Sequence, residues 1–158
     1  MVRSAEPCEL TCSVVIKRSI QQCWDLYTDN TVLSDWAPTV SSVDSDENII
    51  SLNGTRKNNV FIDGKQGHTV EHCTHLDPLK RIDMAISDES FGFSHMLTDY
   101  GTSTTFDVDA QQTLIVLQTR YVPKKIFASI MSAKTTQQPV LVLMKQTLSS
   151  FKQYAELA

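Results

Sequence analysis

Residues 60–65 read Val60-Phe61-Ile62-Asp63-Gly64-Lys65 and predict a tight β-hairpin. Asp-Gly is the preferred pair for a type I′ turn, because both central residues of that turn need a positive φ. The strand that leaves the turn extends to about His75, and Asp77-Pro78 supplies the next turn signal. The centre of the chain is therefore expected to consist of consecutive antiparallel strands.

Apolar and polar residues also alternate on both sides of this hairpin. Downstream, residues 82–86 alternate with period two, which predicts a strand with one buried face. Two long strands are expected near Phe91–Val108 and Thr113–Val122. Upstream, the alternation begins at Leu10, so we expect a first strand there and a short N-terminal lead over residues 1–9.

Helical spacing replaces the alternation near both ends of the chain. Ser19 and Gln22 match a capping box, and we expect a helix there, followed by a second short helix that Pro38 ends. Near the C-terminus, the polar residues 135–138 predict a break, and Pro139 begins a long helix. The buried stripe of that helix is expected to be Leu141, Met144, Leu148, Phe151 and Ala155.

This order of elements predicts the α+β class, with helices and hairpins segregated along the chain. The length of 158 residues fits one domain, which we place at residues 10–158. We see no repeat, low-complexity segment or linker that would indicate a second domain.

Bulk composition excludes several classes of function. A net charge of -4 argues against a nucleic-acid partner, since such proteins need a basic surface. No stretch approaches the ~20 apolar residues of a membrane span. The four cysteines form no metal-binding spacing and no secretory signal is seen, so we expect free thiols and a cytoplasmic location.

Several short motifs, taken in order, resemble the START-related or SRPBCC superfamily, and within it the polyketide cyclase/dehydrase and lipid-transport-like group. The resemblance covers about residues 10–157 and implies a helix-grip fold. In such a fold a curved antiparallel sheet of about six or seven strands wraps around the C-terminal helix, and two short helices follow the first strand. The matching segments are Ile16-Lys17-Arg18-Ser19, Cys23-Trp24-Asp25-Leu26, Leu33-Ser34-Asp35-Trp36-Ala37-Pro38, Gly54-Thr55-Arg56, Glu71, Asp77-Pro78-x-x-Arg81 and residues 148–156.

A cavity between the helix and the sheet is the functional expectation that follows from this fold. A strongly bent sheet cannot touch a straight helix along its whole length, so side chains or a guest must fill the gap. Burial of ~300 Å² of apolar ligand surface there gains several kcal/mol at ~25 cal/mol per Å². The expected ligand-binding residues are Trp36, Met84, Phe93, Phe106, Ile115, Leu117, Tyr121, Met144 and Leu148.

Candidates for chemistry are few, and the catalytic residues remain unassigned. His95, Tyr100 and Tyr121 are the acid–base candidates at the cavity. Glu71 and Asp83 are candidate bases if buried, although their alternation with apolar neighbours favours solvated sheet faces. His68 and His72 would stand ~13 Å apart on one strand, too far to share a metal ion. No P-loop, dinucleotide fingerprint or zinc motif occurs, so we expect no cofactor and no metal.

The sequence therefore favours the binding or transport of a small hydrophobic molecule, such as a lipid or polyketide, over enzymatic activity. Two alternatives stay open: a cyclase or dehydratase that uses cavity Tyr, His or carboxylate groups, and a protein-interaction module. A homodimer also stays open.

Overall fold

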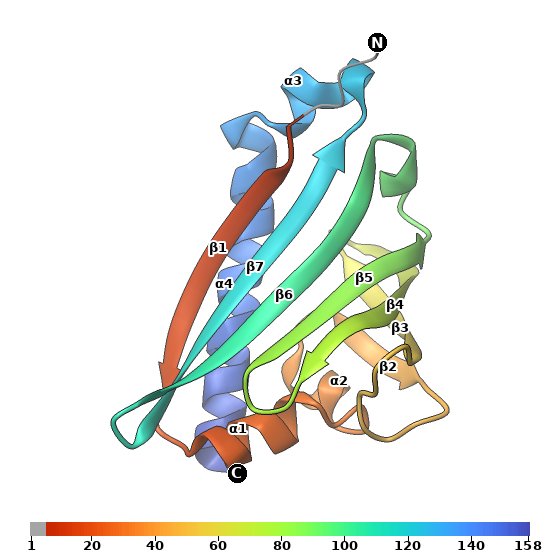
Figure 1. Cartoon of the computed structure of the whole chain (residues 1–158). Helices are drawn as coiled ribbons and strands as arrows, with labels where there is room; N and C mark the ends of the chain where they lie inside the picture. Colours follow the sequence, from red (N-terminus) through yellow and green to blue (C-terminus); the bar gives the residue numbers. More distant parts are fainter. Residues whose placement is uncertain (1–5) are drawn as a thin grey trace.

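The computed structural model describes residues 6–158 as one seven-stranded antiparallel sheet with helices at its ends and along one face (Figure 1). The strand order is β1-β7-β6-β5-β4-β3-β2, so both edge strands come from the N-terminal third of the chain. The elements are β1 (Cys8–Ile16), α1 (Ile20–Tyr27), α2 (Leu33–Trp36), β2 (Val40–Asp44), β3 (Thr55–Ile62), β4 (Lys65–Asp77), β5 (Arg81–Glu89), η1 (Phe93–His95), β6 (Leu97–Asp109), β7 (Gln112–Pro123), η2 (Lys125–Phe127), α3 (Ala128–Met131) and α4 (Lys134–Leu157).

The curved sheet and the long helix α4 confirm the expected α+β, helix-grip architecture. Helix α4 packs mainly against β1 and also contacts α1 and α2, which follow β1 in the chain. In Figure 1, α4 lies behind β1 and β7, while β5, β4, β3 and β2 extend to the right of the picture, away from the helix. The helix therefore covers one half of the sheet much more closely than the other.

Local signals in the sequence are confirmed at the hairpin and at the first helix. Asp63 (φ 50) and Gly64 (φ 77) both adopt the positive φ that a type I′ turn requires. Ser19 Oγ accepts a hydrogen bond from the backbone N–H of Gln22, and the side chain of Gln22 accepts one from the backbone N–H of Ser19. This capping box fixes where α1 begins.

Three element boundaries differ from the sequence prediction. Strand β1 begins at Cys8, because its ladder with β7 already starts at the pair Cys8–Tyr121. Helix α4 begins at Lys134 instead of Pro139, and the expected break at residues 135–138 is absent from it. The backbone N–H groups of Thr136 and Gln137 both donate to the carbonyl of Ala133, which holds this first turn together.

The third difference concerns the expected strand over Phe91–Val108, whose first six residues form a loop and the short helix η1. Gly92 has a φ of 86, which ends the extended conformation. The carboxylate of Glu89 accepts hydrogen bonds from the backbone N–H groups of Phe91 and Ser94 and so stabilises the turn. His95 consequently lies exposed in η1 and not in a strand.

Two separate apolar clusters occupy the interior. The main core contains the interlocked aromatic rings of Trp24, Trp36, Phe106 and Phe151, with Tyr27 packed among them. The second cluster consists of Cys8, Leu97, Tyr121 and Met131, with Phe93, Met96, Tyr100 and Phe127 packed against it.

Candidate functional site

A buried ion pair on the inner face of the sheet is the starting point of the site. Arg56 of β3 and Glu71 of β4 are cross-strand partners, and Arg56 Nε donates to Glu71 Oε2 over 2.6 Å. The exposed fractions of the two side chains are only 10% and 18%. Burying an unpaired charge is costly, so charged side chains at this depth are normally paired and hydrogen-bonded, as these two are.

Asn30, which follows α1, links this pair to the loop between β2 and β3. Its Oδ1 accepts a 3.0 Å hydrogen bond from Arg56 Nη1, while its Nδ2 donates to the carbonyl of Glu47 over 3.0 Å. The backbone N–H of Asn30 also donates to the carbonyl of Asn48. Within residues 6–158, Arg56 Nη2 has no hydrogen-bond partner, so one guanidinium nitrogen is free to bind a ligand acceptor.

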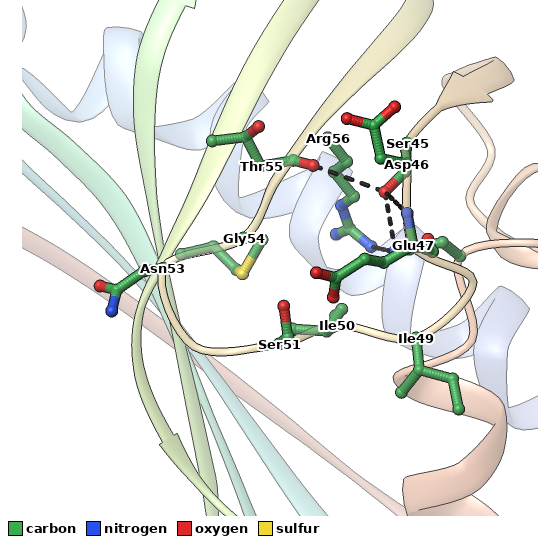
Figure 2. Close-up of a pocket in the computed structure, with 12 residues that line it drawn as sticks. Ser45, Asp46, Glu47, Ile49, Ile50, Ser51, Asn53, Gly54, Thr55 and Arg56 are labelled. Carbon is green, nitrogen blue, oxygen red and sulfur yellow. Dashed lines mark hydrogen bonds between the residues drawn. The ribbon is translucent and has the colours of Figure 1, made fainter.

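A pocket of about 210 Å³ opens onto this arginine. In Figure 2 the loop from Ser45 to Thr55 curves around the space, and the side chains of Glu47 and Ser51 point into the same space as the guanidinium of Arg56. Ile49, Ile50 and Met84 supply apolar surface. The rest of the lining is polar and includes the carboxylates of Asp46 and Glu47 beside the partly satisfied cation of Arg56. A small pocket of this mixed character suits a small amphiphilic ligand.

Polar residues continue from this pocket across the inner face of the sheet. We call Arg56, Asn58, Thr69, Glu71, Thr102 and Thr119 the polar belt. On β7, Thr119 stands between Leu117 of the main core and Tyr121 of the second cluster, all three buried on the inner face. On β6 and β7, Thr102 and Thr119 thus lie between the two apolar clusters, whereas β5 contributes Met84 of the main core at this level.

Asn58 is the least satisfied member of the belt. Its side chain is buried, with 2% of the residue exposed, and its Nδ2 makes one long hydrogen bond to Thr69 Oγ1. Among the described residues its Oδ1 has no hydrogen-bond partner. Exchanging the amide oxygen and nitrogen would only move the unsatisfied position to the other atom, so this side chain retains capacity for a polar group of a guest or a water.

Hydroxyl groups of two tyrosines are already committed to internal hydrogen bonds. Tyr27 shares a 2.8 Å hydrogen bond with Thr104 Oγ1, and burial raises the pKa of its phenol. Tyr121 donates to the carbonyl of Met131 over 2.7 Å, and burial, followed by the neighbouring Cys8, raises the pKa of Tyr121 to about 12. Tyr121 is therefore an unsuitable proton donor in this arrangement.

The remaining acid–base candidates lie apart from each other. Tyr100 packs against the second cluster and lines a cleft of about 350 Å³ where β5 and β6 separate beyond the pair Ala85–Gly101. Burial raises the pKa of Tyr100, and the charges of Glu71 and Glu89 add to this effect. His95 is exposed on η1 and does not line this cleft.

Most of the expected ligand-binding residues belong to the packed interior. Met84 lines the pocket at Arg56, and Phe93 lines the cleft with Tyr100. Tyr121 belongs to the second cluster. The other six residues are buried in the main core: Trp36, Phe106, Ile115, Leu117, Met144 and Leu148.

Apart from Met84, the residues that line the pocket at Arg56 were not among the expected ligand-binding residues. Glu71 was expected on a solvated face, yet it is paired inside the sheet. The period-two pattern of β3 contained the signal, since Val60, Asn58 and Arg56 must share one face if Val60 is buried. Arg120 of β7, by contrast, lies on the surface, where it is half-exposed and pairs with Glu9 at 3.5 Å.

Residues 6–158 contain neither a cluster of metal-binding side chains nor a membrane-spanning helix. No group of three or more His, Cys, Asp or Glu side chains in this part of the chain could hold a metal ion. None of the helices described is both long and apolar enough to cross a lipid bilayer.

A curved antiparallel sheet of seven strands that grips a long C-terminal helix, with short helices after the first strand, defines the class of helix-grip domains within the SRPBCC superfamily. The chain belongs to the polyketide cyclase/dehydrase and lipid transport family, whose model matches residues 7–156. No curated protein matches the chain.

Solved structures share this fold at low sequence identity. Ara h 8.0201 is 13% identical with a TM-score of 0.76, and the match covers 97% of this chain and 100% of that one. The ginseng major latex-like protein 151 of Panax ginseng is 13% identical with a TM-score of 0.75, over 94% and 97% of the two chains. The Zhui aromatase/cyclase of Streptomyces sp. R1128 is 15% identical with a TM-score of 0.75, over 96% and 94%. At these identities the likeness concerns the fold alone.

Proposed function

We propose that this protein binds or transports a small hydrophobic molecule that carries one acidic or other acceptor group. The acceptor group binds Arg56 in the pocket under the β2–β3 loop, and the apolar body contacts Ile49, Ile50 and Met84. The observation that carries the proposal is that this pocket opens onto a buried guanidinium with one unused nitrogen. The family description, polyketide cyclase/dehydrase and lipid transport, supports a ligand of this kind.

Acid–base catalysis on a ligand in the cleft between β5 and β6 is the second candidate, and Tyr100, which lines that cleft, favours it. Its hydroxyl makes no hydrogen bond within residues 6–158, and the carboxylate of Glu71 is near enough to raise the pKa of the phenol. The family description and the aromatase/cyclase activity named for one similar structure support this reading. Tyr100→Phe would then abolish turnover and leave binding intact, whereas a pure carrier shows no turnover to lose.

A displaceable fluorescent probe tests the binding proposal. The probe 1-anilinonaphthalene-8-sulfonate joins an apolar body to an anion, as the pocket requires. We expect saturable binding by the native protein and, in Arg56→Met, an affinity lower by about tenfold, since hydrogen bonds to charged groups contribute roughly 1.5–3 kcal/mol. Glu71→Gln keeps the arginine and removes the competing carboxylate, so we expect this variant to bind the probe more tightly.

Arg81→Met is the matched control, because Arg81 pairs with Asp83 and its side chain is half-exposed. This control should bind the probe as the native protein does. Circular dichroism must show that all three variants fold. Absence of saturable binding by the native protein, together with no small molecule in native mass spectra, would exclude the proposal.

The free thiols support a cytoplasmic site of action. All four cysteines are free, and Cys8, Cys23 and Cys73 are buried. Burial raises the pKa of the Cys23 and Cys73 thiols, which keeps them protonated and unreactive. This state is easily maintained in a reducing compartment.

A further inference from the structure

Two exposed isoleucines stand out on the segment that joins β7 to α4. Ile126 is 82% exposed and Ile130 is 60% exposed. Their neighbours Phe127 and Met131 turn inward and pack with the second cluster. The short segment formed by η2 and α3 is thus apolar on both sides, and only its inner side is covered by the chain.

The charge around these isoleucines is opposite in sign to that of the whole chain. Residues 124–134 contain three lysines and no aspartate or glutamate, although the chain carries a net charge of -4. Lys124, Lys125 and Lys134 are all exposed. We call Lys124, Lys125, Ile126, Ile130 and Lys134 the docking tip.

We propose that the docking tip binds the surface of an anionic phospholipid bilayer. Exposed apolar side chains flanked by lysines bind such surfaces by inserting the apolar groups at the headgroup level while the lysines attract anionic lipids. A protein partner fits less well, since two isoleucines and three lysines supply far less than the ~800 Å² per partner of a stable protein interface. A bilayer needs no matching surface.

The position of the tip suits this contact. In Figure 1, α3 lies at the end of the molecule away from α1 and the C-terminus, where β7 ends and α4 begins. Docking there brings the second cluster, which the same segment covers, next to the lipid. Membrane binding does not depend on the proposed ligand pocket, because the residues that line the pocket at Arg56 include none of the docking tip.

Co-sedimentation with lipid vesicles tests this inference. We expect the native protein to bind vesicles of phosphatidylcholine mixed with phosphatidylserine, to bind pure phosphatidylcholine vesicles much more weakly, and to dissociate at high salt. Lys124→Gln/Lys125→Gln should lower the affinity about thirtyfold, from ~1 kcal/mol per lysine near an anionic surface. Ile126→Ser/Ile130→Ser should lower it by about a hundredfold or more, because both apolar side chains lose their burial in the bilayer.

Val108→Ser is the matched control, since Val108 is also 60% exposed but lies near the end of β6, in the β6–β7 hairpin. Its vesicle binding should equal that of the native protein. Equal binding of the native protein to neutral and anionic vesicles, or unchanged binding by the tip variants, would overturn the inference. So would self-association of the native protein that Ile126→Ser/Ile130→Ser abolishes, because the tip would then be an interface between copies. The fluorescent-probe experiment tests the pocket at Arg56 and the vesicle experiment tests the docking tip, so either proposal can fail without the other.

Discussion

At the residue scale, Tyr121 shows how a side chain expected at a cavity can serve the fold instead. Its ring is buried in the second cluster, and its hydroxyl ties β7 to the carbonyl of Met131 at the end of α3. The bond holds the segment that carries the docking tip against the sheet. The same burial that favours this packing disfavours the phenolate.

Tyr121→Phe should lower the free energy of unfolding by about 1 kcal/mol at neutral pH, because the carbonyl of Met131 loses its donor. A second effect appears in alkali, since the pKa of Tyr121 is raised from 10.0 to about 12. A raised pKa means that the folded state holds the proton more tightly than the unfolded state. Its stabilising effect is therefore complete below pH 10 and is lost as the pH rises toward about 12.

Denaturant unfolding at several alkaline pH values measures this difference. The native protein should lose stability more steeply than Tyr121→Phe over that range, and the late-titrating tyrosinate absorbance should decrease in the variant. Parallel pH profiles for the two proteins would contradict the assignment, even if the neutral-pH stability differed.

At the element scale, the sequence predicted the regular elements well and their irregular junctions poorly. The Asp63-Gly64 turn and the Ser19 capping box were predictable because each depends on a few adjacent residues. The turn at Glu89 to Ser94 was not, because it depends on a carboxylate that folds back onto the backbone. Arg56 was missed for a similar reason: its partner Glu71 is set by the pairing of two strands.

The start of α4 is the other junction that was wrongly predicted, because Pro139 was expected to begin this helix. It lies inside α4, where its nitrogen cannot donate to the carbonyl of Thr135 and its ring crowds that carbonyl. The side chain is exposed and contributes no core packing. Pro139→Ala should therefore stabilise the protein by about 1 kcal/mol or more, since proline costs up to ~3 kcal/mol relative to alanine within a helix.

Thermal unfolding together with amide hydrogen exchange over residues 134–142 checks this expectation. Slower exchange in the variant would locate the gain in the first turns of α4. An unchanged melting temperature would mean that this part of the helix adds nothing to global stability. The carbonyl of Ala133 already accepts two backbone hydrogen bonds, so the first turn of α4 is formed. We therefore expect the melting temperature of Pro139→Ala to rise.

At the scale of the whole molecule, topology and interior filling proved to be separate questions. Alternation and turn signals define how the strands follow one another, so the helix-grip class could be predicted. Whether helix and sheet leave a hollow depends on side-chain volumes at distant positions, such as Trp24, Tyr27 and Phe106, which meet only in the folded chain. Sequence patterns carry no direct measure of that volume.

Phe106 distinguishes a filled interior from a ligand cavity. Its ring lies 5.1 Å from that of Trp24 and 5.3 Å from that of Tyr27, measured between centroids, and the residue is buried. If it is core, Phe106→Ala leaves a hole and lowers the free energy of unfolding by about 3–5 kcal/mol. Phe61→Ala, at a half-exposed position, should change it by less than about 0.5 kcal/mol.

The enlarged interior makes a second readout available, because an apolar hole stays dry and binds small aromatic molecules. Benzene should therefore raise the denaturant midpoint of Phe106→Ala and leave that of the native protein unchanged, through its selective binding to the folded variant. If Phe106 instead faces a natural ligand space, the substitution should weaken binding of the fluorescent probe at little cost in stability. That result would return Phe106 to the ligand-binding set, and the main core would then have to be regarded as the wall of a closed cavity.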